Sequence, residues 1–145
     1  MNEKPKVELL PHEVLERLDT LKNKKERIDF IKANNSYALG TFLQLNYNDS
    51  IKLDLPEGKP PYSPDKCPPG LQYVTTRNAV RSLGDLVVGS RMPAIRKETT
   101  FVTICENLHE KDAEILWRAK DGKISDIYPK ATKALIKEAL PKLNI

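Results

Sequence analysis

Cysteine is scarce in this chain, because Cys67 and Cys105 are the only two among its 145 residues. Two cysteines cannot build a disulfide framework, and a reducing, intracellular setting follows as the expectation. Neither the cysteines nor the two histidines, His12 and His109, stand in a paired CxxC or HExxH pattern. The sequence therefore predicts no metal site and no cofactor.

Long apolar runs are also absent. No stretch approaches the roughly 18 to 20 apolar residues of a membrane span. The opening residues, MNEKPKVELL, hold no apolar core of signal-peptide length. We expect a protein that has no membrane contact and works in the cytoplasm.

Catalytic motifs are missing in the same way. The glycines form neither GxGxxG nor the GK[ST] phosphate loop, and no serine stands in a GxSxG elbow. Cys67 lies beside Lys66 with no base that can be assigned to it, and Cys105 falls on an apolar helical face. We expect no catalytic residues and a protein that is not an enzyme.

Charge of one sign does not dominate the sequence. The formal net charge of +4 arises from 24 basic and 20 acidic residues, which is weaker than the basic stripe of a dedicated nucleic-acid binder. Residues 1–21 carry three bases and five acids, whereas residues 118–142 carry seven bases and three acids. An acidic partner is therefore expected to meet the later part of the chain.

Apolar residues at helical spacing are what the sequence does supply. Pro11 suits a first helical turn, Ser36 and Thr75 or Thr76 suit N-caps, and Gly89 suits a helix end. The sequence predicts helices over residues 11–21, 22–35, 36–46, 75–89, 93–108, 109–122 and 129–140. The expected fold is all-α, a single domain over 1–145 with six to seven short helices. Trp117 is the largest expected core residue.

One segment interrupts this pattern. Residues 55–71, LPEGKPPYSPDKCPPGL, hold six of the eleven prolines, and none of them suits a helix interior. The sequence thus predicts N-terminal helices over 1–54, an ordered proline-rich loop over 55–71, and C-terminal helices over 72–145. Pro61 and Pro64 form a PxxP spacing, which an aromatic groove of a partner could bind as a polyproline II helix. Alternatively Leu55, Tyr62 and Leu71 dock the segment on the chain's own helices as a strap.

A basic cluster follows the first expected helix. Lys22, Lys24, Lys25 and Arg27 could contact phosphates or an acidic protein groove. A solvated helix face explains them equally well, because Glu26 and Asp29 dilute their charge. No aromatic residues alternate with them, which argues against stacking on single-stranded nucleic acid.

Four stretches together resemble a family of small proteins of large lytic tailed bacteriophages that includes the RNA polymerase binding protein RpbA. They are VLERLDTLKNKKERIDFIKANNSYAL at 14–39, LPEGKPPYSP at 55–64, HEKDAEILWRAKDGKI at 109–124, and LIKEALPKL at 135–143. Residues 65–100 carry none of the resemblance.

The resemblance implies a protein without chemistry of its own that binds the host RNA polymerase and modulates transcription during infection, in the cytoplasm of the bacterial host. Nucleic acid would then be contacted through the complex. We expect Lys22, Lys24, Lys25, Arg27, Pro60, Pro61 and Tyr62 to contact the partner. Two alternatives are a basic nucleic-acid-binding module, with DNA or RNA affinity that falls steeply with salt, and a virion structural or assembly protein that self-associates.

Overall fold

The described part of the chain contains seven α-helices and two short 3₁₀ turns, joined by loops. The computed structural model describes residues 9–68, 72 and 75–145, and within these ranges only two isolated β-bridges occur and no strand. The fold is therefore all-α, as predicted. The elements are α1 (Pro11–Thr20), α2 (Lys24–Ala33), α3 (Tyr37–Tyr47), α4 (Thr76–Val80), η1 (Arg81–Leu86), α5 (Ala94–Asn107), α6 (Glu110–Lys120), η2 (Ile124–Asp126) and α7 (Lys133–Ala139).

Side-chain caps fix where most helices begin. Ser36 accepts a hydrogen bond from the backbone N–H of Leu39, and Thr75 accepts one from Asn78, as the sequence predicts. Asn23 and Thr132 do the same for α2 and α7. Pro11 occupies the first turn of α1, where its missing N–H costs nothing.

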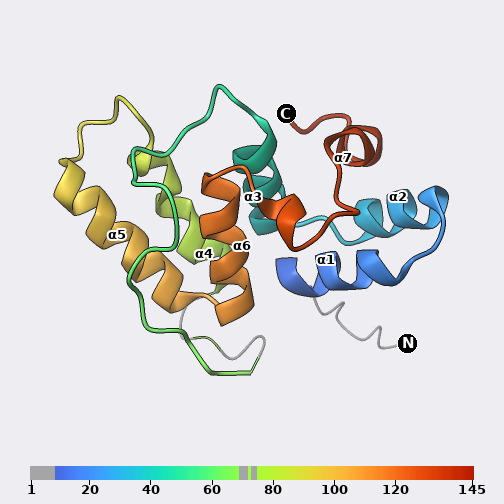
Figure 1. Ribbon diagram of the computed structural model, residues 1–145, viewed down its shortest axis with the longest axis horizontal. Coiled ribbons are helices and arrows are strands. Elements are labelled where there is room, and N and C mark those ends of the chain that lie inside the picture. Colours follow the sequence, from blue (N-terminus) through green and yellow to red (C-terminus); the bar gives the residue numbers. More distant parts are fainter. Residues whose placement is uncertain (1–8, 69–71, 73–74) are drawn as a thin grey trace, which may run out of the picture.

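Helix α6 lies at the centre of the fold. It packs against α3, α5 and α1, and it continues into η2 (Figure 1). Helix α2 packs against α1 and α7 at one end of the molecule, while α4, η1 and α5 form the other end. The largest completely buried side chains include Phe42 of α3 and Phe101 of α5, so one apolar core extends across these layers.

The chain between α3 and α4 contains no helix over residues 55–68, the described part of the proline segment. Residues 52–54, just before this segment, are hydrogen-bonded to residues 86–88 at the end of η1. Asp54 donates its N–H to the Leu86 carbonyl at 2.8 Å, and Val88 donates its N–H to the Lys52 carbonyl at 3.0 Å. Residues 55–62, here called the strap, then run beside α5 and α6 (Figure 1). Leu71, expected as an apolar anchor, lies outside the described residues.

Two predicted helices differ from the structure in extent. The helix expected over 75–89 is α-helical only to Val80 and continues as the 3₁₀ turn η1. It ends at Leu86 because Val87 is extended and forms a bridge with Leu53. The last helix begins at Lys133 instead of Pro129, since Thr132 supplies the cap. Pro141 follows α7 as expected.

One residue prediction was wrong. Trp117, the largest expected core residue, is only partly buried: it packs against the core, and the Arg118 guanidinium lies over its ring, 4.7 Å from the ring centre. None of the helices in the described ranges is long and apolar enough to cross a bilayer.

Candidate functional site

A groove of about 450 Å³ separates the strap from α5. Pro56, Pro60 and Pro61 line it from the strap, and Phe101 and Val102 line it from α5. Two of the predicted contact residues, Pro60 and Pro61, therefore border the same groove. Since proline fixes its own φ, this wall is conformationally stiff.

A buried ion pair at the end of α6 holds the strap in place. The Lys120 ammonium donates to the Asp121 carboxylate at 2.7 Å and to the carbonyls of Pro56 at 2.7 Å and Gly58 at 3.2 Å. Asp121 in turn accepts the Gly58 N–H at 2.8 Å. The two charged side chains are only 4% and 5% exposed. This clamp binds the backbone of the strap, so it does not depend on the strap's side chains.

A second buried lysine fixes the chain that leads into the strap. Lys97 of α5 is 3% exposed, and its ammonium contacts the Asp54 carboxylate at 2.9 Å and the Val87 carbonyl at 3.2 Å. It stands one helical turn before Phe101 on the buried face of α5. Sequence reasoning missed it because lysine is rarely buried unless paired, and its partners are distant in sequence.

Tyr62, the third predicted contact residue of the strap, is half-buried against the core. Burial raises the pKa of its phenol to about 12. The Lys59 ammonium lies 5.5 Å from the centre of its ring, within cation–π range. Tyr62 therefore anchors the strap more than it offers a free surface.

The rim of the groove is mainly acidic. Glu57 of the strap and Glu98 and Glu106 of α5 are exposed carboxylates among its lining residues, against one exposed base, Lys59. An apolar floor with an acidic rim suits a protein segment that carries aliphatic and basic side chains.

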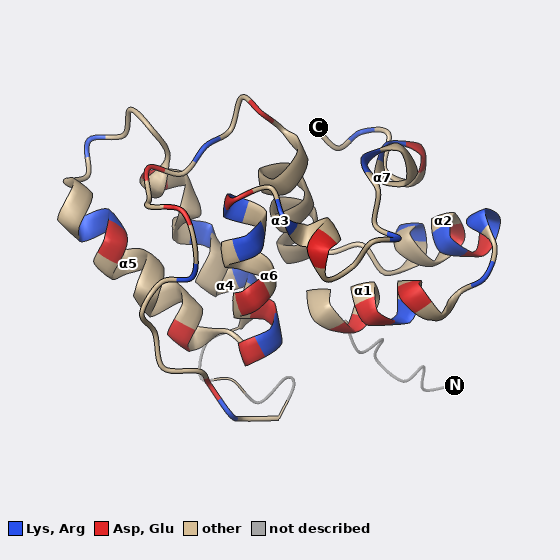
Figure 2. Ribbon diagram, in the orientation of Figure 1, with Lys and Arg blue, Asp and Glu red and all other residues tan. Residues whose placement is uncertain are grey.

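The predicted basic cluster lies elsewhere. Lys22, Lys24 and Lys25 are exposed at the start of α2, which packs on α1 and α7 at the end of the molecule away from the strap (Figure 2). Lys24 pairs with Glu138 of α7 at 2.8 Å, and the Arg27 side chain donates to the Leu21 carbonyl. The structure does not bring the basic cluster and the prolines together, so they cannot form one site.

A buried polar cluster joins α1 to α6. One carboxylate oxygen of Asp112 accepts the backbone N–H of His12 at 2.8 Å and lies 2.9 Å from the Nδ1 of its ring. The His12 ring stacks on that of His109 with centroids 4.3 Å apart. Since His12 is in the first turn of α1, Asp112 caps that helix from a distant element. From the sequence, His109 is expected only at the start of a helix, and no local signal pairs it with His12.

Metal ligation and thiol chemistry have little geometric basis in the described residues. No group of three or more histidine, cysteine or acidic side chains could hold a metal ion there. Cys105 is buried, which raises the pKa of its thiol to about 12. Cys67 is exposed, and its hydrogen bond with Asp65 raises the pKa of its thiol above the ordinary value.

These thiols should react in two separate phases. In the folded protein we expect one equivalent of thiol, Cys67, to react with Ellman's reagent, and the second, Cys105, only after unfolding, because thiolate content and access set the rate. Asp65→Asn should accelerate the first phase by removing the charge that opposes the thiolate. Cys67→Ser should abolish it. Two fast thiols in the native state would contradict the burial of Cys105.

In a comparison with protein families, the model of a family of unknown function (DUF6433) matches residues 14–126. The matched range covers α1 from Val14 onward, α2 to α6, the strap and both walls of the groove. Comparisons with curated proteins and with solved structures find no match.

Proposed function

We propose that this chain, which belongs to the family of unknown function DUF6433, is a non-enzymatic accessory protein that binds a bacterial host's RNA polymerase and modulates transcription during phage infection. The strap groove is its contact surface. The choice of partner is supported by the four resembling segments of the sequence. Three of these, at 14–39, 55–64 and 109–124, fall inside the range that the family model matches.

The observation that carries the proposal is the clamp on the strap. A preordered wall loses less conformational entropy on docking than a flexible one. Here two consecutive prolines border the groove, and the buried Lys120 holds the backbone just before them. The strap acts as an ordered loop presented to a large partner.

The first test is a tagged pull-down from host lysate at moderate and high salt after nuclease treatment. Polymerase subunits retained in stoichiometric amounts under both conditions support the proposal. Loss of every partner after nuclease would instead favour a nucleic-acid module.

The packing of α2 on α7 is the observation that favours this second candidate, because it brings the lysines of both helices to one end of the molecule. Three acidic residues are interspersed among these lysines: Glu26, Asp29 and Glu138.

Replacing both Pro60 and Pro61 with glycine should weaken polymerase binding more than it lowers stability. Freeing two residues that must be reordered on docking costs about 2 to 4 kcal/mol of binding free energy. The free energy of unfolding should fall by only about 1 to 2 kcal/mol, because replacing proline by glycine raises the conformational entropy of the unfolded chain by a smaller amount than the entropy lost on docking. Titration of the polymerase and thermal unfolding measure the two quantities.

Pro64→Gly is the matched control, since Pro64 is exposed in the same segment and lies outside the groove. It should leave the affinity near that of the wild type. If the double variant lost more stability than affinity, the prolines would serve the fold and not the partner.

A further inference from the structure

A second groove, of about 270 Å³, lies on another side of the molecule, between α3, residues 51–53, and the α4–η1 segment. Its walls are largely aliphatic: Leu45 comes from α3, Leu53 from the chain before the strap, and Val80 and Leu83 from α4 and η1. These four side chains also belong to the core, so the groove is built on the rigid part of the fold.

Arginine and tyrosine form the rim of this groove. Tyr37, which lines it, is 49% exposed, and the Arg77 guanidinium lies 5.6 Å from the centre of its ring. Arg81 is exposed and also lines the groove. Neither arginine makes an ion pair with a carboxylate of the described residues, so both guanidinium groups remain available to a partner.

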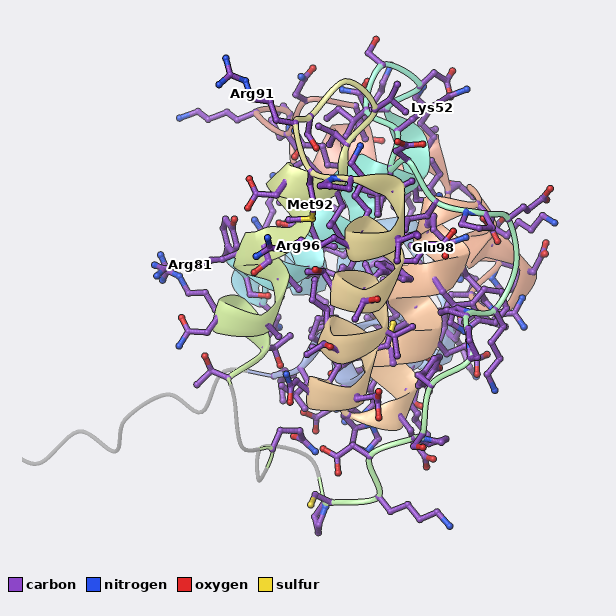
Figure 3. The ribbon with its side chains drawn as sticks, turned by 90° about the vertical axis from the view of Figure 1, so that its left-hand side faces the viewer. Lys52, Arg81, Arg91, Met92, Arg96 and Glu98 are labelled. Carbon is purple, nitrogen blue, oxygen red and sulfur yellow. The ribbon has the colours of Figure 1, made fainter. Side chains whose placement is uncertain are left out.

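The surrounding surface extends this positive charge. Residues 76–96 contain four of the chain's seven arginines and a single acidic residue, Asp85. In Figure 3 the side chains of Arg81 and Arg91 project outward from the end of the molecule formed by α4, η1 and α5, and Arg96 of α5 lies on the same side of the α5 ribbon as Arg81. Glu98, which borders the strap groove, lies on the other side of the α5 ribbon (Figure 3). The two grooves thus carry rims of opposite charge.

We propose that this second groove docks an acidic segment of a protein partner, with an aliphatic side chain seated between α3 and η1 and carboxylates paired with Arg77 and Arg81. The inference rests on the proposed function, since it takes the partner to be the RNA polymerase. The second groove would then be an additional contact surface, so the protein binds its partner through a basic groove as well as through the strap.

The composition of the surface favours a protein over a nucleic acid. Arginine and tyrosine are enriched at the centres of protein interfaces, where lysine is depleted, and guanidinium pairs with carboxylate through two parallel hydrogen bonds. Two aliphatic side chains at this end of the molecule are also exposed: Val88, just after η1, by 64%, and Ile95, at the start of α5, by 80%. A phosphate backbone would leave these aliphatic side chains and the groove itself without a matching partner.

Gly84 provides a clean way to block the groove. It lines the groove, its φ is not in the left-handed region, and a Cβ added to it would meet no atom within 4 Å. Gly84→Glu therefore places a carboxylate at the groove to repel an acidic segment, and its Cβ meets no neighbouring atom. Arg81→Glu reverses the charge of the rim. Lys32→Glu makes the same change in net charge as Arg81→Glu at an exposed position of α2, and serves as the control.

The experiment titrates purified host RNA polymerase with the wild type and these three variants, with thermal unfolding to confirm that each is folded. We expect Gly84→Glu and Arg81→Glu to weaken binding by about tenfold or more, and Lys32→Glu to change it by less than about twofold, since rim charges away from a contact act weakly. That pattern, at unchanged melting temperature, supports the docking groove.

The other outcomes each overturn part of the account. If the wild type binds and Gly84→Glu and Arg81→Glu bind equally well, the groove is not a contact, while the proposed function stands. If the wild type does not bind polymerase, both proposals fall. If a short DNA duplex binds the wild type with steep salt dependence and Arg81→Glu abolishes this, the surface is a nucleic-acid site and not a protein site.

Discussion

Lys120→Met should lower the free energy of unfolding by about 3 to 5 kcal/mol, because it removes one partner of a buried ion pair and leaves the other charge without compensation. Met retains the apolar stem of lysine but none of its donors. The variant loses all three contacts of the ammonium, to Asp121, the Pro56 carbonyl and the Gly58 carbonyl. Chemical denaturation measures the loss, and hydrogen exchange of the Gly58 amide shows whether the strap has been released.

Lys123→Met is the matched control for this prediction. Lys123 also contacts the strap, through Glu57 at 3.2 Å, but the two side chains are 49% and 74% exposed. An exposed pair of this kind is screened by solvent, so Lys123→Met should leave the free energy of unfolding near that of the wild type. Equal losses in the two variants would mean that the clamp is no stronger than a surface ion pair.

Asp112→Ala should also destabilise the protein strongly, by roughly 2 to 4 kcal/mol, because it leaves buried donors of His12 without an acceptor. The change removes the cap on α1 and the hydrogen-bonded connection between α1 and α6. Asp112→Asn retains an acceptor oxygen and should lose about half as much. Denaturant melts of both variants give the comparison.

Asp29→Ala controls for the general effect of losing a helical carboxylate, since Asp29 is exposed on α2. It should change stability by less than about 0.5 kcal/mol. A loss at Asp112 no greater than that at Asp29 would contradict the capping role assigned to the buried cluster.

Much of the helical framework follows from local sequence signals. The caps at Ser36 and Thr75 and the apolar spacing in α1, α3, α5 and α6 were sufficient to predict these helices. The failures have tertiary causes. The helix expected to reach Gly89 stops at Leu86 because Val87 pairs with Leu53, a residue on the other side of the proline segment.

The candidate site was less accessible from the sequence. Pro60 and Pro61 can be singled out from the sequence because the segment around them is rich in proline. The sequence around Lys120 and Asp121, in contrast, indicates only an ordinary charged helix end. The cluster of His12, His109 and Asp112 joins positions about a hundred residues apart, which no spacing rule connects. The arginine-rimmed groove likewise depends on α3 and η1 meeting in space. Such sites require the fold before they can be recognised.

Direct binding of RNA polymerase by the isolated protein can be measured without other host factors. Purified protein is titrated against purified, nucleic-acid-free polymerase of the host bacterium, and the bound fraction is followed by fluorescence anisotropy of a label on Cys67, the exposed thiol. We expect saturable binding at about micromolar concentration or below, with a fixed stoichiometry that persists at high salt. Absence of binding, while the same labelled protein binds DNA or only itself, would contradict the account.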